Sequence, residues 1–253
     1  MFLYNYPVIV VGIAALIVWL KIRQMRRYQI ELEQKVEERT HDLKLEKEKS
    51  ERLLLNILPS EVAKELTEHP NQTIAKKFPN ITVLFTDIVG FTKMSDGMTA
   101  EQVVTMLNKM VSLFDERAKR EGIEKIKTIG DAYMAATGFT EETDNDGALR
   151  MVHFAIGLMD DVRRFNETSS VKVQIRLGIN TGNLVAGVIG KSKFIYDIWG
   201  DTVNVASRME STGEPMKIHV TEKTYDQTKD QFAYSEGIEV EVKGKGKMKT
   251  YFL

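Results

Sequence analysis

Phe-Thr-Asp-Ile-Val-Gly-Phe-Thr, at residues 85–92, places the carboxylate of Asp87 directly after an apolar run. That run, residues 81–85, predicts a buried strand, and Gly90 breaks the pattern just beyond the aspartate. A carboxylate at the end of a core strand needs a partner, because an isolated buried charge is costly. The sequence therefore predicts a second functional group beside Asp87.

Asp131 is the candidate for that group. It lies in Thr-Ile-Gly-Asp-Ala-Tyr-Met-Ala, residues 128–135, where Gly130-Asp131 is typical of a tight turn between two strands. Two aspartates at neighbouring strand ends repel each other unless a cation lies between them. A site with a small number of hard oxygen ligands suits Mg²⁺, because this ion takes its remaining ligands from water and phosphate. The alternative is that both aspartates are ordinary turn residues.

Three segments together resemble one known family. They are residues 85–92, Lys-Ile-Lys-Thr-Ile-Gly-Asp-Ala-Tyr-Met-Ala at 125–135, and Tyr-Asp-Ile-Trp-Gly-Asp-Thr-Val-Asn-Val-Ala-Ser-Arg-Met-Glu at 196–210. In this order they closely resemble the class III nucleotidyl cyclases, and the resemblance covers residues 78–253. It implies an α+β catalytic domain with a ferredoxin-like antiparallel sheet and helices.

The resemblance also implies a metal site. Asp87 and Asp131 would hold two Mg²⁺ ions, with Mn²⁺ able to substitute, helped by the backbone carbonyl of Ile88. Two metals about 3.5–4 Å apart activate an attacking oxygen and neutralise a leaving group. The implied reaction is attack of the ATP 3′-hydroxyl on the α-phosphate, which produces cyclic AMP and pyrophosphate.

The remaining substrate contacts follow from the same resemblance. Asn204 would orient the ribose, and Arg208 would stabilise negative charge on the attacked phosphate, a task that suits a permanently charged guanidinium. The two residues are one helical turn apart and share a face. Lys243 matches the phosphate-contacting lysine of the family, and Lys245 is a near-equal candidate in the same turn.

Lys127 and Asp197 bear on the choice of base. Adenine presents an acceptor at N1 and a donor at its amino group, so an ammonium and a carboxylate complement it. Guanylate-specific members of the family carry an acidic residue and a cysteine at these two places. The sequence therefore predicts ATP as substrate. Taken alone, a lysine in the position of Lys127 is more often a solvated strand residue.

In the resembled family, the metal-binding aspartates come from one subunit and the base, ribose and transition-state residues from the other. This chain holds both sets, which implies a symmetric homodimer with two shared sites. Two alternatives stay open. One is a guanylate cyclase, and the other is a catalytically silent dimerisation module.

Composition limits the other possibilities. The 253 residues are 43% hydrophobic and 28% charged with a net charge of −1, as expected for one main globular domain with appendages. The near-zero charge argues against nucleic-acid binding. The chain has no cysteine, which excludes thiolate catalysis, zinc–thiolate sites and disulfides.

Residues 1–20 carry no charge and predict a transmembrane helix, since about 20 residues at about 1.5 Å each span a hydrocarbon core of about 30 Å. Lys21, Arg23, Arg26 and Arg27 follow, which places the rest of the chain in the cytoplasm by the positive-inside rule. We expect a single-pass protein of the inner or plasma membrane. The alternative is a buried core helix. An activating signal would come through a membrane sensor partner, or through further sequence if the chain is a fragment.

Residues 21–58 predict a parallel coiled-coil stalk, and residues 59–77 a transducing linker to the catalytic domain. The alternative to the coiled coil is an isolated charged helix. Polar residues interrupt the heptad, so the stalk would be only marginally stable. Its apolar core positions are Ile22, Met25, Leu32, Val36, Leu43, Leu53 and Ile57.

The pattern of elements agrees with the implied fold. A capping box from Thr99 to Gln102 begins a helix that ends near Gly122. A hairpin around Gly130, a helix over residues 146–165 and a strand over 171–180 complete a split βαβ plan with helices on one face of the sheet. Residues 181–183 and 187–190 predict hairpin turns. Asp201 is expected to cap the helix that carries Asn204 and Arg208.

Overall fold

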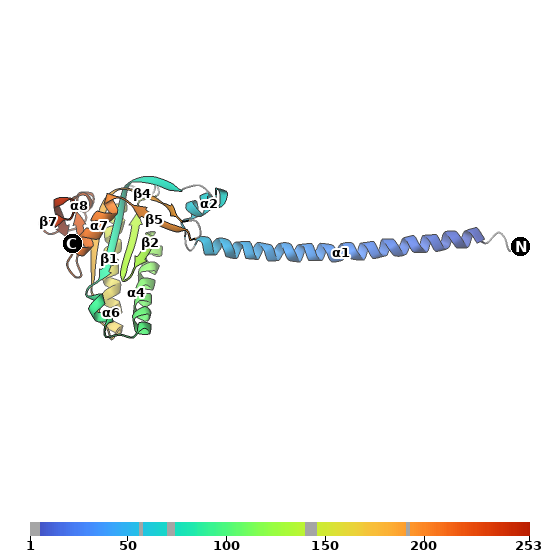
Figure 1. The fold of residues 1–253 in the computed structure, drawn as a ribbon, viewed down its shortest axis with the longest axis horizontal. Helices are drawn as coiled ribbons and strands as arrows, with labels where there is room; N and C mark the ends of the chain where they lie inside the picture. Colours follow the sequence, from blue (N-terminus) through green and yellow to red (C-terminus); the bar gives the residue numbers. More distant parts are fainter. Residues whose placement is uncertain (1–5, 56–57, 70–73, 140–145, 191–192) are drawn as a thin grey trace. The chain divides into compact units, whose positions relative to one another are not determined.

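The computed structural model describes residues 6–55, 58–69, 74–139, 146–190 and 193–253. Its contacts divide the chain into two units, residues 1–68 and 69–253. The first unit contains two helices, α1 (Tyr6–Leu55) and α2 (Ser60–Glu68). The second contains all of the strands (Figure 1).

Helix α1 runs without a break through most of the two segments predicted as membrane span and stalk. Among the described residues, no helix combines the length and the apolar character of a membrane span. The first five residues of the predicted span lie outside the described residues, and so does Ile57 of the heptad. The described heptad side chains are exposed in the single chain: Ile22, Met25, Leu32, Val36, Leu43 and Leu53.

The second unit is built on one sheet with the order β2-β3-β1-β4-β6-β8-β7, and β5 pairs with β4. β1 is the central long strand, antiparallel to both β3 and β4. The prediction of a wholly antiparallel sheet was wrong, because β4 and β6 are parallel. The strands are β1 (Ala75–Ile88), β2 (Glu124–Ile129), β3 (Ala132–Thr137), β4 (Ile175–Ile189), β5 (Ile195–Trp199), β6 (Ile218–Thr221), β7 (Ile238–Val242) and β8 (Gly246–Phe252).

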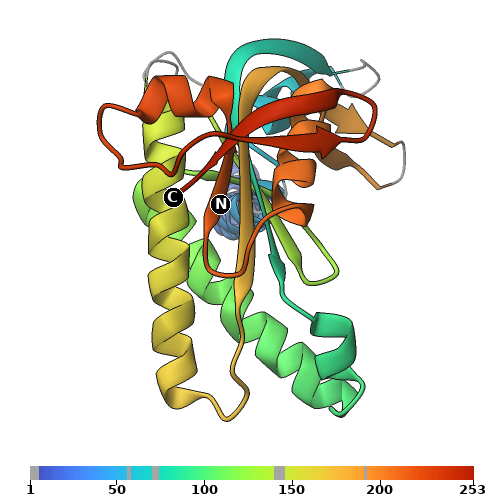
Figure 2. The same ribbon diagram turned by 90° about the vertical axis from the view of Figure 1, so that its left-hand side faces the viewer.

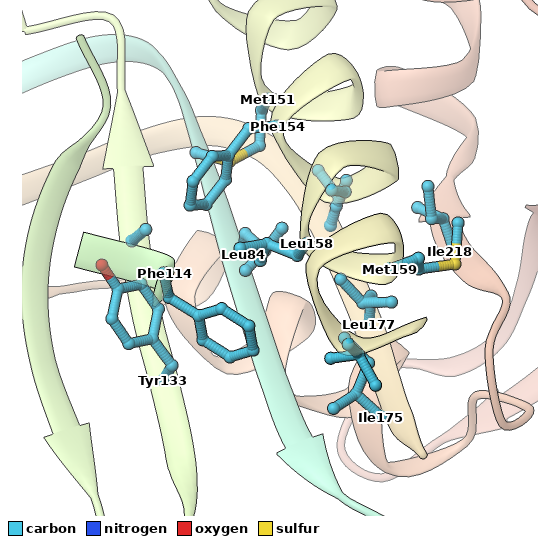
Figure 3. Close-up of a cluster of buried hydrophobic side chains, with 14 of the residues drawn as sticks. Leu84, Phe114, Tyr133, Met151, Phe154, Leu158, Met159, Ile175, Leu177 and Ile218 are labelled. Atoms are coloured by element: carbon cyan, nitrogen blue, oxygen red, sulfur yellow. The ribbon is translucent and has the colours of Figure 1, made fainter. Parts of the chain in front are cut away.

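Alternation along β1 sends side chains into two cores on opposite faces of the sheet. Leu84 packs with Phe114, Leu158 and Leu177 under two long helices (Figure 3). Val83 and Phe85 point the other way and pack against Ala206. The helices of the unit are α3 (Phe91–Ser95), α4 (Ala100–Glu121), α6 (Gly147–Thr168), α7 (Asp201–Ser211) and α8 (Glu222–Thr228).

The expectation that the helices cover one face was therefore wrong. α4 and α6 cover one face, and α7 covers the other, which Figure 2 shows with α6 in yellow and α7 in orange on either side of the strands. The reason is that both faces of the central strands are apolar, so each needs its own cover. The face under α7 is the one that matters for the predicted site residues Asn204 and Arg208.

Helix ends behave largely as predicted. Thr99 accepts a hydrogen bond from the Gln102 backbone, the Gln102 side chain accepts one from the Thr99 backbone, and Gly122 ends α4 in the left-handed conformation. The expected cap at Asp201 was wrong. Gly200 is the N-cap of α7 and Asp201 is its first residue, with no side-chain cap bond.

The predicted turns at residues 181–183 and 187–190 were also wrong over most of their length, because β4 continues from Ile175 to Ile189. Its glycines mark close approach of other groups rather than reversals of the chain. A Cβ on Gly182 would lie 2.4 Å from Thr202 Oγ1, and one on Gly187 would lie 2.3 Å from Ile74 O. Only Gly190, with φ of 112°, ends the strand as a turn residue.

Gly178 allows α7 to lie directly on the sheet, since a Cβ there would be 1.9 Å from Glu210 N and 2.6 Å from Ala206 O. We expect Gly178→Ala to lower the free energy of unfolding by about 3 kcal/mol, because the helix must move off the strand. Urea unfolding of the full chain measures this. Gly97→Ala is the control, since its nearest neighbour is Met94 O at 3.9 Å. Equal stability of the two variants would show that α7 has room to move.

Candidate active site

Two carboxylates meet where β1 ends. Asp87 is the penultimate residue of β1, and Asp131 follows Gly130, whose φ of 64° makes the tight turn between β2 and β3. The pairing of Thr86 with Tyr133 brings that turn beside the end of β1. The two carboxyl groups lie close enough for Asp87 to perturb the ionisation of Asp131 through its charge and a hydrogen bond. The prediction that these aspartates are neighbours is thus confirmed by the geometry.

The contact is electrostatically unfavourable when both groups are charged. Burial, the hydrogen bond to Asp87 and the charge of Asp87 raise the pKa of Asp131 from 3.8 to about 6, while backbone N–H groups, including that of Ile88, act in the opposite direction. Like charges in contact disfavour joint ionisation. A cation between the two carboxylates would remove this cost.

Arg176 is a third member of this cluster that the sequence reasoning missed. It lies opposite Asp87 in the β1–β4 register, and its guanidinium is 3.3 Å from Asp87 Oδ2 and 2.9 Å from Glu210 Oε1. Burial raises the pKa of Glu210, and Arg176 opposes that rise. A signal was present, because an arginine between the apolar residues Ile175 and Leu177 is unusual in a buried strand.

Lys127 and Asp197 are held together. Lys127 Nζ donates to Asp197 Oδ2 at 2.5 Å, and the other carboxylate oxygen accepts from the Ile198 backbone at 2.9 Å. The strands β2 and β5 that carry them are distant in sequence. The structure thus pairs the ammonium and the carboxylate that the sequence proposed as base-reading groups.

The hairpin that carries Lys127 and Asp131 is fastened to α4. Asp115 on that helix accepts a hydrogen bond from Tyr133 at 2.9 Å and one from Lys125 Nζ at 2.7 Å. Tyr133 is fully buried and its ring meets that of Phe114 edge to face. These contacts fix the position of the β2–β3 turn, and with it Asp131, relative to the end of β1.

Asn204 and Arg208 lie on the exposed side of α7, one turn apart as expected. In the part of the chain that the structure describes, the Arg208 guanidinium has no hydrogen-bond or ion-pair partner. The opposite side of α7 is buried through Val205, Ala206 and Met209. The Arg208 guanidinium is therefore exposed on the surface of α7 and is not engaged in a salt bridge with the described residues.

The two candidate lysines in the β7–β8 turn differ in their contacts. Lys245 Nζ is 2.7 Å from Asp201 Oδ2 at the first turn of α7. Lys243 is exposed, and among the described residues its ammonium has no ion-pair partner. This ion pair joins the β7–β8 turn to the first turn of α7.

Comparison with known proteins decides the family. The sequence profile of the adenylate and guanylate cyclase catalytic domain matches residues 73–253. The chain belongs to this family. The match covers the whole second unit from β1 onward and includes every site residue described above.

Individual relatives agree with this assignment. The cyclase chain is 38% identical over 242 residues to an adenylate cyclase of Mycobacterium tuberculosis, covering 96% of this chain and 52% of that protein. It is 40% identical over 235 residues to the human atrial natriuretic peptide receptor 2, covering 91% of this chain and 22% of the receptor. The chain thus spans about half, or less, of the length of these relatives.

A solved structure shares the cyclase fold. It is the catalytic core of a rhodopsin-guanylyl cyclase with converted specificity, in complex with ATPalphaS. The two chains are 41% identical with a TM-score of 0.66, over 70% of this chain and 96% of that one. The likeness covers the catalytic unit.

The aspartate pair fits a divalent cation. Across the described ranges, no cluster of three or more His, Cys, Asp or Glu side chains is arranged around a metal position. Two carboxylates and a backbone carbonyl are an incomplete shell for Mg²⁺, which normally completes its shell with water and substrate phosphates. The donor set is all oxygen, and burial together with the neighbouring Asp87 carboxylate raises the pKa of Asp131.

The sign of that pKa shift leads to a stability prediction for Asp131→Asn. In the unfolded chain Asp131 ionises near 3.8 and in the folded cyclase near 6, so the free energy of unfolding falls as the pH rises through that interval. In EDTA at pH 7.5 we expect the variant to be more stable by about 1 kcal/mol, a value reduced for solvent screening. At pH 4 most of the difference should be gone.

Denaturant titrations at the two pH values measure this difference. Asp230→Asn, at an exposed position after α8, is the matched control and should show no pH-dependent gain. A loss of stability in Asp131→Asn at pH 7.5 would contradict the electrostatic account of the pair.

Proposed function

We propose that this cyclase is a membrane-anchored adenylate cyclase that converts ATP to 3′,5′-cyclic AMP and pyrophosphate. The 3′-oxygen of the ribose forms a bond to the α-phosphorus and loses its proton, while the bond from that phosphorus to the departing pyrophosphate breaks. The observation that carries the proposal is the contact of Asp87 with Asp131 in a domain of this family.

Asp87, Asp131 and the backbone carbonyl of Ile88 would hold two Mg²⁺ or Mn²⁺ ions. These ions supply activation of the attacking oxygen and neutralisation of the leaving group. Arg176 lies beside the pair and forms an ion pair with Asp87. Once a bound cation neutralises Asp87, the Arg176 guanidinium would be available to bind a substrate phosphate. The cluster therefore combines acidic ligands for metal with a guanidinium for the substrate anion.

The choice of ATP rests on Lys127 and Asp197. Their 2.5 Å contact places a donor and an acceptor in one half-buried position, which complements N1 and the amino group of adenine. Guanine reverses this polarity and would leave polar groups unpaired. The relative of converted specificity that holds ATPalphaS supports the idea that a few residues in this fold choose the base.

On the other half of the site, Asn204 would orient the ribose and Arg208 would stabilise charge on the attacked phosphate. The free guanidinium of Arg208 supports this role, because a transition-state cation must be available to substrate. Lys243 is the better candidate for the phosphate-contacting lysine, since Lys245 is engaged with Asp201.

Two such chains would form a homodimer with two shared sites. In each site, one protomer supplies Asp87 and Asp131, and its partner supplies the base-reading and transition-state groups. The exposed apolar positions of α1 support a parallel stalk that joins the protomers, since isolated helices of this length gain stability by burying such a stripe.

The membrane anchor rests on the sequence. Residues 1–20 would cross the inner or plasma membrane once, with the basic residues after them and the catalytic domain on the cytoplasmic side. A sensor partner in the membrane would then act through the stalk and the linker at residues 59–77. Attachment of the full chain to membranes after carbonate washing tests this part, and release by the wash would refute it.

Base preference gives a direct test. The full chain, assayed with Mg²⁺ or Mn²⁺, should produce cyclic AMP from ATP far faster than cyclic GMP from GTP. Lys127→Glu combined with Asp197→Cys should lose at least about tenfold in ATP turnover and shift the preference towards GTP, because the hydrogen-bond polarity is reversed. Lys223→Glu, at an exposed lysine on α8, should leave the preference unchanged.

Other results have definite meanings. A chain that prefers GTP would be a guanylate cyclase. A chain inactive with both nucleotides, while folded and dimeric, would be a silent dimerisation module. Unchanged ATP preference in the double variant would show that Lys127 and Asp197 do not read the base.

Subunit mixing tests the shared site. Asp87→Ala removes the metal half and Arg208→Ala the transition-state half, so each variant homodimer should be nearly inactive. Random mixing makes half of the dimers mixed, and each mixed dimer has one intact site and one doubly defective site. About a quarter of wild-type activity should therefore return. No recovery, with exchange verified by crosslinking, would refute the shared architecture.

A further inference from the structure

His219 is the one histidine of the catalytic unit that is fully buried, at 0% exposure, and no role described above uses it. It lies on β6, between the carboxyl-terminal end of α7 and strand β8. Its ring stacks on Phe252 with centroids 4.2 Å apart and an interplanar angle of 9°. The ring is therefore held in one orientation by a flat aromatic surface.

Both ring nitrogens have partners from different elements. Nδ1 is 2.8 Å from the Met209 backbone oxygen, and Nε2 is 2.8 Å from Thr250 Oγ1. A carbonyl oxygen can only accept, so Nδ1 carries the proton and donates to Met209. Nε2 of the neutral ring then accepts from the Thr250 hydroxyl. The 2.8 Å contact with Nε2 is shorter than the 3.4 Å contact of the Thr250 hydroxyl with Ile238 O, so the hydrogen bonds favour one tautomer of a neutral imidazole.

The carbonyl of Met209 is one that the helix itself leaves unpaired. The last four carbonyls of a helix have no intrahelical donor. Here the amides of Thr212 and Gly213 bond to Arg208 O and Glu210 O, on either side of Met209 in the chain. His219 thus completes the last turn of α7 one residue after Arg208.

The second hydrogen-bond partner of His219, Thr250, links the ring to the hairpin that carries the candidate phosphate-contacting lysines. Thr250 is on β8, which follows the turn containing Lys243 and Lys245. At the amino-terminal end of α7, the Lys245–Asp201 ion pair joins the helix to the same turn. The helix is therefore tied to the β7–β8 hairpin at both ends, by an exposed ion pair at one and a buried imidazole at the other.

We infer that neutral His219 is a positioning residue for Arg208. It holds the last turn of α7 through the bond to Met209, and it holds that turn against β8 through the bond to Thr250. This inference rests on the proposed role of Arg208. It assigns to His219 no contact with substrate. A shift of α7 by a fraction of a helical turn would move the guanidinium from the attacked phosphate and slow the chemical step more than it weakens ATP binding.

The surroundings oppose a charged ring. Burial lowers the pKa of His219, and the Met209 carbonyl and Glu214 act weakly in the opposite direction. Glu214 is itself paired with Lys217 at 2.6 Å, and the Lys217 ammonium lies 5.6 Å from the Phe252 ring centroid. No carboxylate of the described residues contacts the imidazole directly, so the neutral form holds down to pH values below its ordinary range.

Three substitutions separate the contacts. His219→Asn keeps a donor at the place of Nδ1 and loses the Nε2 contact. His219→Leu loses both. Thr250→Val removes the Nε2 partner, together with the 3.4 Å contact of the same hydroxyl to Ile238 O, and leaves the Met209 bond in place, so it is the matched control for His219→Asn.

In the full chain with Mg²⁺ and ATP, we expect His219→Leu to lower kcat about ten- to hundredfold with KM within about twofold. His219→Asn and Thr250→Val should retain kcat within about threefold, because the bond to Met209 remains. Equal losses in His219→Leu and His219→Asn, or a change in KM instead of kcat, would overturn the positioning role.

Amide hydrogen exchange of residues 209–213 gives a readout that does not depend on activity. Protection should fall at least about tenfold in His219→Leu and persist in His219→Asn. In the wild type it should also fall below pH 6.5, as protonation of the ring becomes favoured in the opened state. Unchanged protection in His219→Leu would refute the inference even if kcat fell. A wild-type chain inactive with ATP and GTP would refute the proposed function, while the exchange data would still decide whether His219 holds α7.

Discussion

Asp87 and Asp131 are two carboxylates in contact at the end of a core strand, and their mutual repulsion determines what the surroundings must supply. Arg176 supplies one positive charge and shares it with Glu210, which is too little for three acidic groups. The cluster is therefore short of positive charge until a cation binds. Under the proposed metal role, binding of Mg²⁺ would stabilise the strand ends, since the same charges that would attract the ion repel each other without it.

Arg176 also joins two parts of the molecule that act in different proposed roles. Its guanidinium contacts Asp87 on β1 and Glu210 on α7, and α7 carries Asn204 and Arg208. In a homodimer with shared sites, the metal half and the transition-state half of one protomer belong to different sites. A change in the charge at Asp87 would then alter the ion pair between Arg176 and Glu210 on α7, the helix that serves the neighbouring site.

The close seating of α7 makes these connections possible. Gly178 lets the backbone of the helix approach β4 near the start of the strand, where any side chain would collide with Glu210 N. At this distance, Glu210 reaches Arg176, and the end of the helix reaches His219. The position of Arg208 is therefore a consequence of packing on the far face of the sheet from α4 and α6.

The sequence by itself determined the features that depend on neighbouring residues or on a distinctive order of segments. The capping box at Thr99, the glycine that ends α4 and the tight turn before Asp131 are local, and all three are present in the structure. The three segments also sufficed to identify the cyclase family and to nominate Asp87, Asp131, Lys127 and Asp197. Tertiary structure decided what depends on distant partners. Gly182 and Gly187 of β4 predict turns when only their neighbours in the chain are considered, whereas in the fold they accommodate Thr202 and Ile74. Asp201 resembles an N-cap in the sequence, whereas in the fold Gly200 is the N-cap and the Asp201 carboxylate pairs with Lys245, far along the chain. The contacts of Arg176 and His219 likewise exist only because strands and a helix distant in sequence pack together, and a local pattern contains no information about such partners.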